Sequence, residues 1–432
     1  MDNRTAGPLK IIRHYLQRYA LTTNRISVKP NPDLGIIVVI PAYKEPDIFT
    51  TLLSLYQCDR PEITTEVIVV INYPENAPKE IISKSKKDHQ ELSGWAATHH
   101  DERLNFHILL EGNLPKRSAG PGLARKIGMD EAVWRFNLIQ NATGIIASLD
   151  ADAAVQPNYL ISIHQHWLQH PDCTGVSIHF EHPIDGPMDE RIYTGIIDYE
   201  IHLRYYINVQ IYAGFPYAYQ TVGSSFAVSA NTYAKQGGMN KRQAGEDFYF
   251  IQKIIPQGNY FNLNGTTVIP SPRPSDRVPF GTGRIIRDFL ETGIGTITSY
   301  NFKSFLDLKI LLDSWQLFCQ NNNTENMELL KAFPLPVQSF LNNQNMLFHL
   351  DQMKSKTTSS ETFKKAFFQW FNAFMLMKYI HFARDNYYPN VVIREAVSEY
   401  LAAIRETEIS SKSNKDLLLW MRERDKKLFQ VK

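Results

Sequence analysis

Short apolar runs alternate with longer amphipathic or polar stretches over the first part of the chain. Four of these runs are rich in Ile, Val or Leu: 34–46, 65–76, 103–112 and 143–152. Continuous aliphatic runs are typical of strands that are buried on both faces, as in a parallel sheet. The stretches between them are compatible with helices. The pattern therefore predicts βαβ units and an α/β fold with a mostly parallel sheet flanked by helices.

The pattern continues to about residue 300 and then changes. We expect a further strand at 174–183, a long amphipathic helix at 189–214, a short strand at 225–229 and a helix that begins near Glu246. From residue 302 onward the spacing is helical and few glycines occur, which predicts a helical region. Three parts are expected: an N-terminal helical extension (1–33), an α/β domain (34–300) and a mainly helical C-terminal domain (301–432).

Composition and charge exclude several classes of protein. The chain has 432 residues, of which 43% are hydrophobic and 21% charged, and this is typical of a globular protein. The 46 basic and 44 acidic residues leave a net charge of +2, which argues against nucleic-acid binding by bulk electrostatics. The three cysteines form no C-x-x-C pair, so neither a zinc knuckle nor a redox motif is indicated. An odd number of cysteines suits a reducing compartment, and we expect a cytoplasmic protein.

No apolar stretch approaches the roughly 20 residues that a membrane-spanning helix needs. The most apolar long stretch, 366–383, is interrupted by Gln369, Asn372, Lys378 and His381. We interpret it as a buried helix, and a helix that lies on a membrane surface is the alternative. The start of the chain has scattered charges and no apolar core, so it does not resemble a signal peptide.

Two carboxylates follow the fourth apolar run, in the sequence SLDADAAV at 148–155. Ligands bind open parallel sheets beyond the carboxyl ends of the strands, and Asp150 and Asp152 are expected at such an end. Residues two apart in extended backbone point the same way, so both carboxylates could face one hard cation, Mg²⁺ or Mn²⁺. The alternative is a turn in which the acidic side chains only bond the backbone.

A second acidic pair, Glu246 and Asp247, is expected at the start of a helix. Negative charge is favourable at a helix N-terminus because of the helix dipole. The pair could therefore serve only to start the helix, and its own sequence does not decide between this role and a catalytic one.

Taken together, the segments resemble glycosyltransferase family 2, whose catalytic domain has the GT-A fold. VIPAYKEP is similar to the first strand of the family, GPGLARKIG to its Gly-x-x-x-Ala-Arg-Asn-x-Gly segment, and SLDADAAVQPNYL to its D-x-D strand. VGSSFAVSANTYAKQGGM resembles the acceptor loop and Gly-Gly turn, and GED resembles the Glu-Asp base motif. The five segments stand in the order of the family, and the resemblance covers roughly residues 34–284.

The resemblance implies a role for each matching residue. A UDP- or GDP-linked sugar donor would be bound by Pro41, Ala42, Tyr43, Glu45, Asn72, Arg125, Asp150, Arg277 and Arg284. A Mn²⁺ or Mg²⁺ cofactor would be held by Asp150 and Asp152, and the acceptor by Gly223 and Ser224. Asp247 would be the general base, and Glu246 would orient the acceptor or its neighbour.

The chain departs from the family pattern at several places. Asn72 stands where the family usually has an acidic residue that touches the nucleotide base, and ARK replaces Ala-Arg-Asn. The Gln-x-x-Arg-Trp motif and the membrane helices of processive synthases are absent from the sequence. Instead, residues 271–284 form a segment rich in Gly and Pro with Arg273, Arg277 and Arg284. These arginines could clamp a diphosphate, recognise an anionic acceptor, or belong to an ordinary linker.

The resemblance implies a metal-dependent, inverting transfer of one sugar, in the hexosyltransferase class, to a hydroxyl of a glycan, a lipid-linked or a small-molecule acceptor. A location at the inner face of a membrane is compatible with a lipid-linked acceptor, and no nucleic-acid partner is expected. A nucleotidylyltransferase or a dinucleotide oxidoreductase is disfavoured, because no glycine-rich loop follows the first strand. A GT-A scaffold without turnover is the remaining alternative.

Overall fold

The computed structural model describes residues 3–21, 24–276, 281–292 and 297–428. The chain divides into two compact units that alternate along the sequence. The first unit comprises Met1–Pro183, Thr221–Arg284 and Asp425–Lys432. The second comprises Ile184–Gln220 and Ile285–Arg424.

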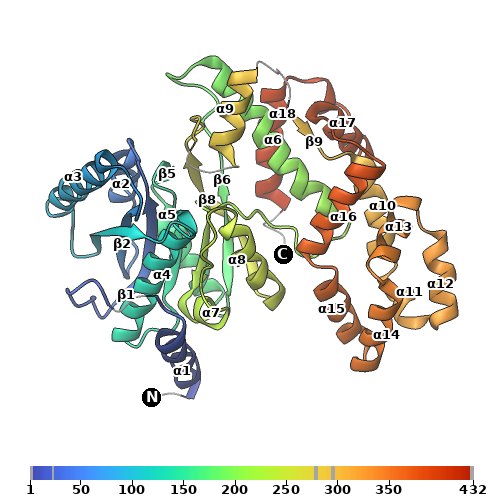
Figure 1. The fold of residues 1–432 in the computed structure, drawn as a ribbon, viewed down its shortest axis with the longest axis horizontal. Coiled ribbons are helices and arrows are strands. Elements are labelled where there is room, and N and C mark those ends of the chain that lie inside the picture. The colour runs from blue at the N-terminus through green and yellow to red at the C-terminus, as the bar shows by residue number, and fades with distance from the viewer. Residues whose placement is uncertain (1–2, 22–23, 277–280, 293–296, 429–432) are drawn as a thin grey trace. The chain divides into compact units, whose positions relative to one another are not determined.

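One sheet forms the centre of the first unit (Figure 1). Within the described residues it has eight strands in the order β3-β2-β1-β4-β7-β6-β8-β5. The strands are β1 (Leu34–Ala42), β2 (Thr64–Pro74), β3 (Leu104–Leu114), β4 (Ile145–Ser148), β5 (Ala153–Val155), β6 (Gly175–Phe180), β7 (Phe226–Ser229) and β8 (Tyr260–Pro270). The pairs β1·β2, β2·β3, β1·β4 and β6·β8 are parallel, and β4·β7, β6·β7 and β5·β8 are antiparallel.

Helices flank this sheet, and the expected α/β fold class is confirmed. They are α1 (Asn3–Arg18), α2 (Ile48–Tyr56), α3 (Lys79–Ala96), α4 (Pro121–Leu138), α5 (Tyr159–Gln169), α7 (Ala230–Lys235), α8 (Glu246–Ile254) and the 3₁₀ turn η1 (Ile255–Gln257). α4 packs against β1 and β2, and α3 against β2 and β3. Residues 36–40 of β1 have no exposed surface. This is why the strand is a continuous aliphatic run and not an alternating one.

The structure contains strands that the apolar pattern did not predict. β8 extends over eleven residues, and the three-residue β5 pairs with it. The sequence of β8, YFNLNGTTVIP, contains polar residues and a glycine, so it shows no long aliphatic run. Its two signals are the β-branched residues at 266–269 and the Gly258 turn before it.

The N-terminal segment is anchored on α4 by buried carboxylates. The Tyr15 hydroxyl donates to Asp130 Oδ1 (2.5 Å), and the Leu21 amide donates to Asp130 Oδ2 (2.9 Å). The Arg25 and Ile26 amides donate to the carboxylate of Glu131 (2.9 and 3.1 Å). Asp130 and Glu131 are fully buried, so these donors supply partners that the two carboxylates need.

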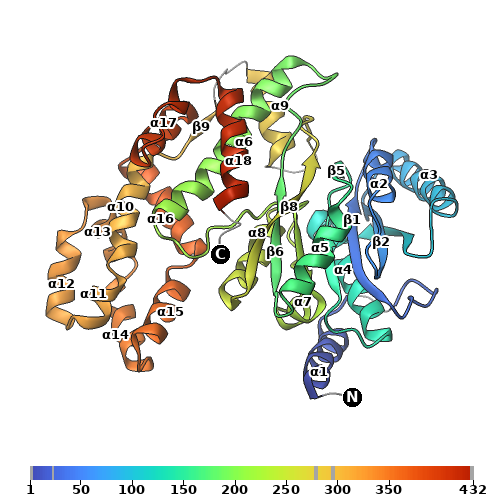
Figure 2. The same ribbon diagram turned by 180° about the vertical axis from the view of Figure 1, so that it is seen from behind.

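The second unit is mainly helical (Figure 2). Its elements are α6 (Glu190–Tyr212), most of α9 (Thr282–Thr292), β9 (Thr298–Ser299), α10 (Phe302–Asp313), α11 (Trp315–Gln320), α12 (Asn323–Ala332), α13 (Leu335–Asn343), α14 (Met346–Lys356), α15 (Ser360–Trp370), α16 (Ala373–Asn386), β10 (Val391–Val392), α17 (Ile393–Ala403), the 3₁₀ turn η2 (Ile409–Ser411) and most of α18 (Asn414–Leu428). α6 packs against α10 and α17, where the ring of Tyr205 meets Phe305 and Tyr400.

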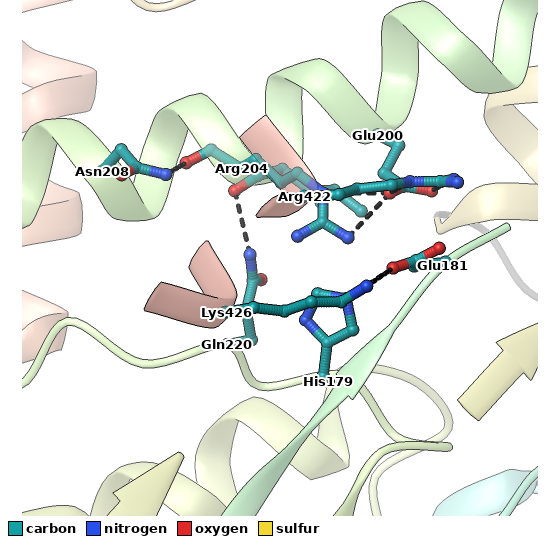
Figure 3. Close-up of polar contacts among 9 residues, drawn as sticks. His179, Glu181, Glu200, Arg204, Asn208, Gln220, Arg422 and Lys426 are labelled. Atoms are coloured by element: carbon teal, nitrogen blue, oxygen red, sulfur yellow. Dashed lines mark hydrogen bonds and ion pairs between the residues drawn. The ribbon is translucent and has the colours of Figure 1, made fainter. Parts of the chain in front are cut away.

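A buried ionic cluster lies inside the second unit (Figure 3). The Glu200 carboxylate accepts from the guanidinium of Arg204, one turn later on α6, at 2.8 Å. The same carboxylate accepts from Nε and Nη2 of Arg422, each at 2.8 Å. Figure 3 also shows a contact within the first unit, where Lys426 Nζ lies 2.8 Å from Glu181 Oε1. The end of the chain therefore contributes to both units.

The apolar stretch at 366–383 is not one helix. α15 ends at Trp370, and α16 begins at Ala373 after Asn372 caps its first amides (Phe374 N and Met375 N, at 3.0 and 3.2 Å). Asn372, which interrupts the apolar pattern, is therefore the N-cap residue of α16. Over the described residues, no helix is both long and apolar enough to span a membrane.

Candidate active site

The residues of the candidate site lie within the first unit, apart from Arg277, which lies outside the described residues. Asp150 and Asp152 follow the end of β4, as expected. The chain does not stay extended there, because residues 151–152 form a turn in which the Ala153 amide donates to the Asp150 carbonyl (3.1 Å). The argument from strand alternation is therefore wrong in its detail. The two carboxylates are nevertheless close enough for Asp152 to raise the pKa of Asp150.

Arg125 connects the end of β4 with the start of α8. It lies in the first turns of α4, and 3% of its side chain is exposed. One terminal nitrogen donates to Asp150 Oδ1 (2.6 Å), and the other donates to Glu246 Oε1. Such charge-assisted bonds are short and directional, so Arg125 holds two acidic segments of the chain beside each other.

Glycines allow this close approach. A Cβ atom on Gly122, in the first turn of α4, would lie 2.3 Å from the Arg242 carbonyl oxygen, which no real contact permits. A Cβ on Gly223 would lie 2.9 Å from Arg125 Nη2 and 3.0 Å from Asp247 Oδ2. The Gly223 carbonyl accepts from the Ser148 hydroxyl (2.8 Å), which ties the Gly223 loop to β4. Gly223 therefore lies directly beside the predicted base.

Ser224, the other predicted acceptor residue, is buried, and its hydroxyl lies 3.2 Å from that of Ser225. The role of Ser224 stays a prediction.

The environment of Asp247 raises the pKa of its carboxyl group to about 7. Burial is the main cause, and the negative charge of Glu246 adds to it. The Arg125 guanidinium and the Phe248 amide, which donates to Asp247 Oδ1 at 2.7 Å, act in the opposite direction. Burial also raises the pKa of Asp150, with Arg125 opposing and Asp152 and Glu246 adding to the effect. A carboxyl group whose pKa lies near neutrality can both accept and release a proton under ordinary conditions.

Most of the remaining donor residues lie at the carboxyl ends of β1 and β2. Pro41 and Ala42 are its last residues, and Tyr43 and the buried Glu45 follow. Asn72, near the end of β2, donates from its amide to the Ala42 carbonyl (3.0 Å), so it holds the two strand ends together. Arg284 lies in the first turn of α9.

Arg273 belongs to the same group of residues, although the resemblance gave it no role. Its Nη2 donates to the carboxylate of Glu45 and to Asp152 Oδ2 (3.1 Å). Together with Lys44, Pro274, Ser275 and Asp276 it lines a pocket of about 210 Å³. The sequence showed a basic residue between two prolines, but it gave no sign of which carboxylates this residue would meet.

The two aspartates fit one mode of divalent-cation binding. Mg²⁺ is commonly bound by one or two protein carboxylates, and it takes its other ligands from substrate phosphates and water. The mutual repulsion of Asp150 and Asp152 is what a cation would relieve. Over the described part of the chain, no group of three or more His, Cys, Asp or Glu side chains could hold a metal ion. Phosphate or water would therefore have to complete the coordination.

Comparisons with known proteins add little to this geometry. A scan against models of protein families and a search of curated protein sequences both found no match. Among solved structures, the chain is similar to residues 1–349 of S. aureus TarS in complex with UDP-GlcNAc, with 13% identity, a TM-score of 0.38, and coverage of 92% of this chain and 90% of that chain. It is also similar to the mannosyltransferase PcManGT from Pyrobaculum calidifontis in complex with GDP-Man and Mn²⁺, with 17% identity, a TM-score of 0.36, and coverage of 85% and 95%. Sequence identities and TM-scores this low do not indicate the function of this chain.

Proposed function

We propose that this protein is a glycosyltransferase that moves one sugar from a nucleoside-diphosphate donor to an acceptor hydroxyl. The observation that carries the proposal is the set of residues around Arg125. This one guanidinium binds Asp150, beyond the end of β4, and Glu246, at the start of α8. It thereby brings a carboxylate pair suited to a cation next to a carboxyl group with a pKa of about 7.

Each of the site residues is proposed to act in donor binding, acceptor binding or proton transfer. Glu45, Asn72 and the end of β1 would bind the nucleoside, and Asp150 would contact the ribose or share the cation. The acceptor hydroxyl would lie beside Gly223 and donate its proton to Asp247 as its oxygen attacks the anomeric carbon. The bond from that carbon to the nucleoside diphosphate breaks in the same displacement, which inverts the configuration. A positioned general base contributes roughly 100- to 10,000-fold in rate.

A bound Mn²⁺ or Mg²⁺ would neutralise charge on the departing diphosphate. Asp152, with Asp150, is the residue that would hold it. Arg277 and Arg284 are proposed to bind the donor from the segment after β8.

The test is calorimetric titration of the full chain with UDP and GDP, and then with their sugars, each with and without Mn²⁺. Mn²⁺-dependent binding of one nucleotide supports the proposal and identifies the donor class. Asp152→Asn is expected to lose this binding. If the folded protein binds no nucleotide under any of these conditions, the glycosyltransferase proposal is wrong and the scaffold without turnover is favoured.

A further inference from the structure

Arg273 joins two carboxylates at the carboxyl ends of β1 and β4. Its Nη2 donates to the Glu45 carboxylate and, at 3.1 Å, to Asp152 Oδ2. The Glu45 side chain is almost fully buried, and the other two side chains are about one-fifth exposed (19% for Arg273 and 23% for Asp152). The guanidinium is therefore shielded from solvent, and its contact with Asp152 is stronger than an ion pair on an open surface.

The backbone holds Arg273 in this place. Pro272 and Pro274 flank it, and each proline fixes its own φ angle. The segment is also attached at both ends, since the Ser271 amide donates to the Asp152 carbonyl (3.1 Å) and the Ser275 amide to the Gly283 carbonyl (2.9 Å). The guanidinium is thus positioned beside Asp152 by the fold as well as by charge.

We propose that Arg273 is a built-in counter-cation of Asp152 that competes with the divalent cation for this carboxylate. The inference rests on the proposed function, because it takes Asp152 as the residue that holds the cation. A carboxylate oxygen that accepts from a guanidinium is a weaker ligand, and the positive charge of Arg273 repels a second cation.

The competition makes cation binding depend on the nucleotide. A diphosphate brings negative oxygens to which a guanidinium binds well, so it gives Arg273 a new partner as the cation takes Asp152. The cation alone then binds weakly, and the cation with UDP or GDP binds tightly. In this arrangement Arg273 is a positioning residue that couples the two ligands.

The experiment measures Mn²⁺ binding to the full chain by the electron paramagnetic resonance signal of free Mn²⁺, without sugar donor or acceptor. Arg273→Gln is expected to bind Mn²⁺ alone about tenfold more tightly than the wild type, because one nearby positive charge is lost. It should also gain less affinity for Mn²⁺ when UDP or GDP is added.

Two variants control for charge and for folding. Arg117→Gln removes the same charge from an exposed position of the first unit and should leave Mn²⁺ affinity unchanged. Arg273→Lys keeps the positive charge and should bind Mn²⁺ about as weakly as the wild type.

The outcomes separate the two proposals. Equal or weaker Mn²⁺ binding by Arg273→Gln, with Asp152→Asn weaker than the wild type, overturns the competition and leaves the metal site standing. If neither the wild type nor Arg273→Gln binds Mn²⁺, even with UDP or GDP, then the competition and the metal dependence of the proposed function both fail. Nucleotide binding without metal in the same samples would preserve the proposed donor site.

Discussion

At the scale of single residues, the site is defined by how each charge is compensated. Arg125 forms ion pairs with Asp150 and Glu246, and Arg273 with Asp152 and Glu45, so each guanidinium faces two carboxylates. Asp247 has no such direct ion pair among the contacts described above, and burial raises the pKa of its carboxyl group to about 7. A base that has to take up a proton during the reaction is useful when its pKa lies near the working pH.

The pKa of Asp247 predicts the pH dependence of the proposed reaction. The base is active only when ionised, so kcat/KM is expected to rise about tenfold per pH unit below pH 7 and to level off above it. The measurement is kcat/KM for sugar transfer between pH 5 and pH 9. A rate that is flat from pH 5 upward would contradict the assignment of Asp247 as the base.

Asp247→Asn is expected to lose transfer and gain stability. Transfer should fall roughly 100- to 10,000-fold with nucleotide binding retained.

The same substitution should change the pH dependence of stability. The pKa of Asp247 in the folded protein, about 7, lies above the ordinary value of 3.8, so the folded protein binds more protons than the unfolded chain between these pH values. The free energy of unfolding of the wild type therefore falls as pH rises through this window. Asparagine removes this effect. At pH 8 the variant should be more stable by roughly 1 to 3 kcal/mol in urea denaturation, with a smaller difference at pH 4. Equal stability at both pH values would argue against a raised pKa.

At the scale of elements, α4 is the helix on which the site depends. Its first turns carry Arg125, and its middle carries the buried Asp130 and Glu131 that bind the N-terminal segment. The Tyr15 hydroxyl donates to Asp130 and accepts from Lys126 Nζ (2.6 Å). The N-terminal segment is therefore part of the support of α4.

Tyr15→Phe is expected to lower the free energy of unfolding by about 1 to 3 kcal/mol, because a buried hydrogen bond to a charged group is lost without a change of shape. Tyr19→Phe is the matched control on the same segment. Tyr19 is 53% exposed, so the same deletion should change stability by less than about 0.5 kcal/mol. Urea denaturation of both variants measures the difference. Equal effects would mean that Tyr15 does not anchor the segment.

At the scale of the whole molecule, the chain alternates between the two units. α6 belongs to the second unit, although the strands before and after it belong to the first. Its buried carboxylate Glu200 is neutralised by Arg422, which lies more than two hundred residues later (Figure 3). The boundary at residue 300 that the sequence suggested stays a prediction, and it can be tested directly.

A fragment of residues 1–300 is expected to fold poorly. It keeps α6 but lacks α10 and α17, against which α6 packs, and it lacks Arg422. Exposed apolar side chains are unfavourable, and so is a buried carboxylate that keeps Arg204 but loses both hydrogen bonds from Arg422. Size-exclusion chromatography and dye binding should show aggregation or exposed apolar surface relative to the full chain. A monomeric fragment with a cooperative unfolding transition would support the boundary at 300 instead.

The sequence by itself determined the fold class and the order of the site segments. The aliphatic runs at 34–46 and 65–76 report burial on both faces, which is a local property of the chain and can be read without a structure. The acidic pairs at the end of β4 and the start of α8 could also be found in the sequence, because each pair lies within one short segment. The strand β8 could not, because its polar residues give it no aliphatic run and its place in the sheet comes from pairing with β6.

Only the tertiary structure decided which charges meet. Arg273 and Glu45 are 228 positions apart, and Arg125 and Glu246 are 121 apart. No local pattern connects such residues, because their contact depends on how strands and helices pack around the sheet. The same packing raises the pKa of Asp247, since burial and the nearness of Glu246 exist only in the folded chain. The residue types came from the sequence, and their pairing and protonation came from the fold.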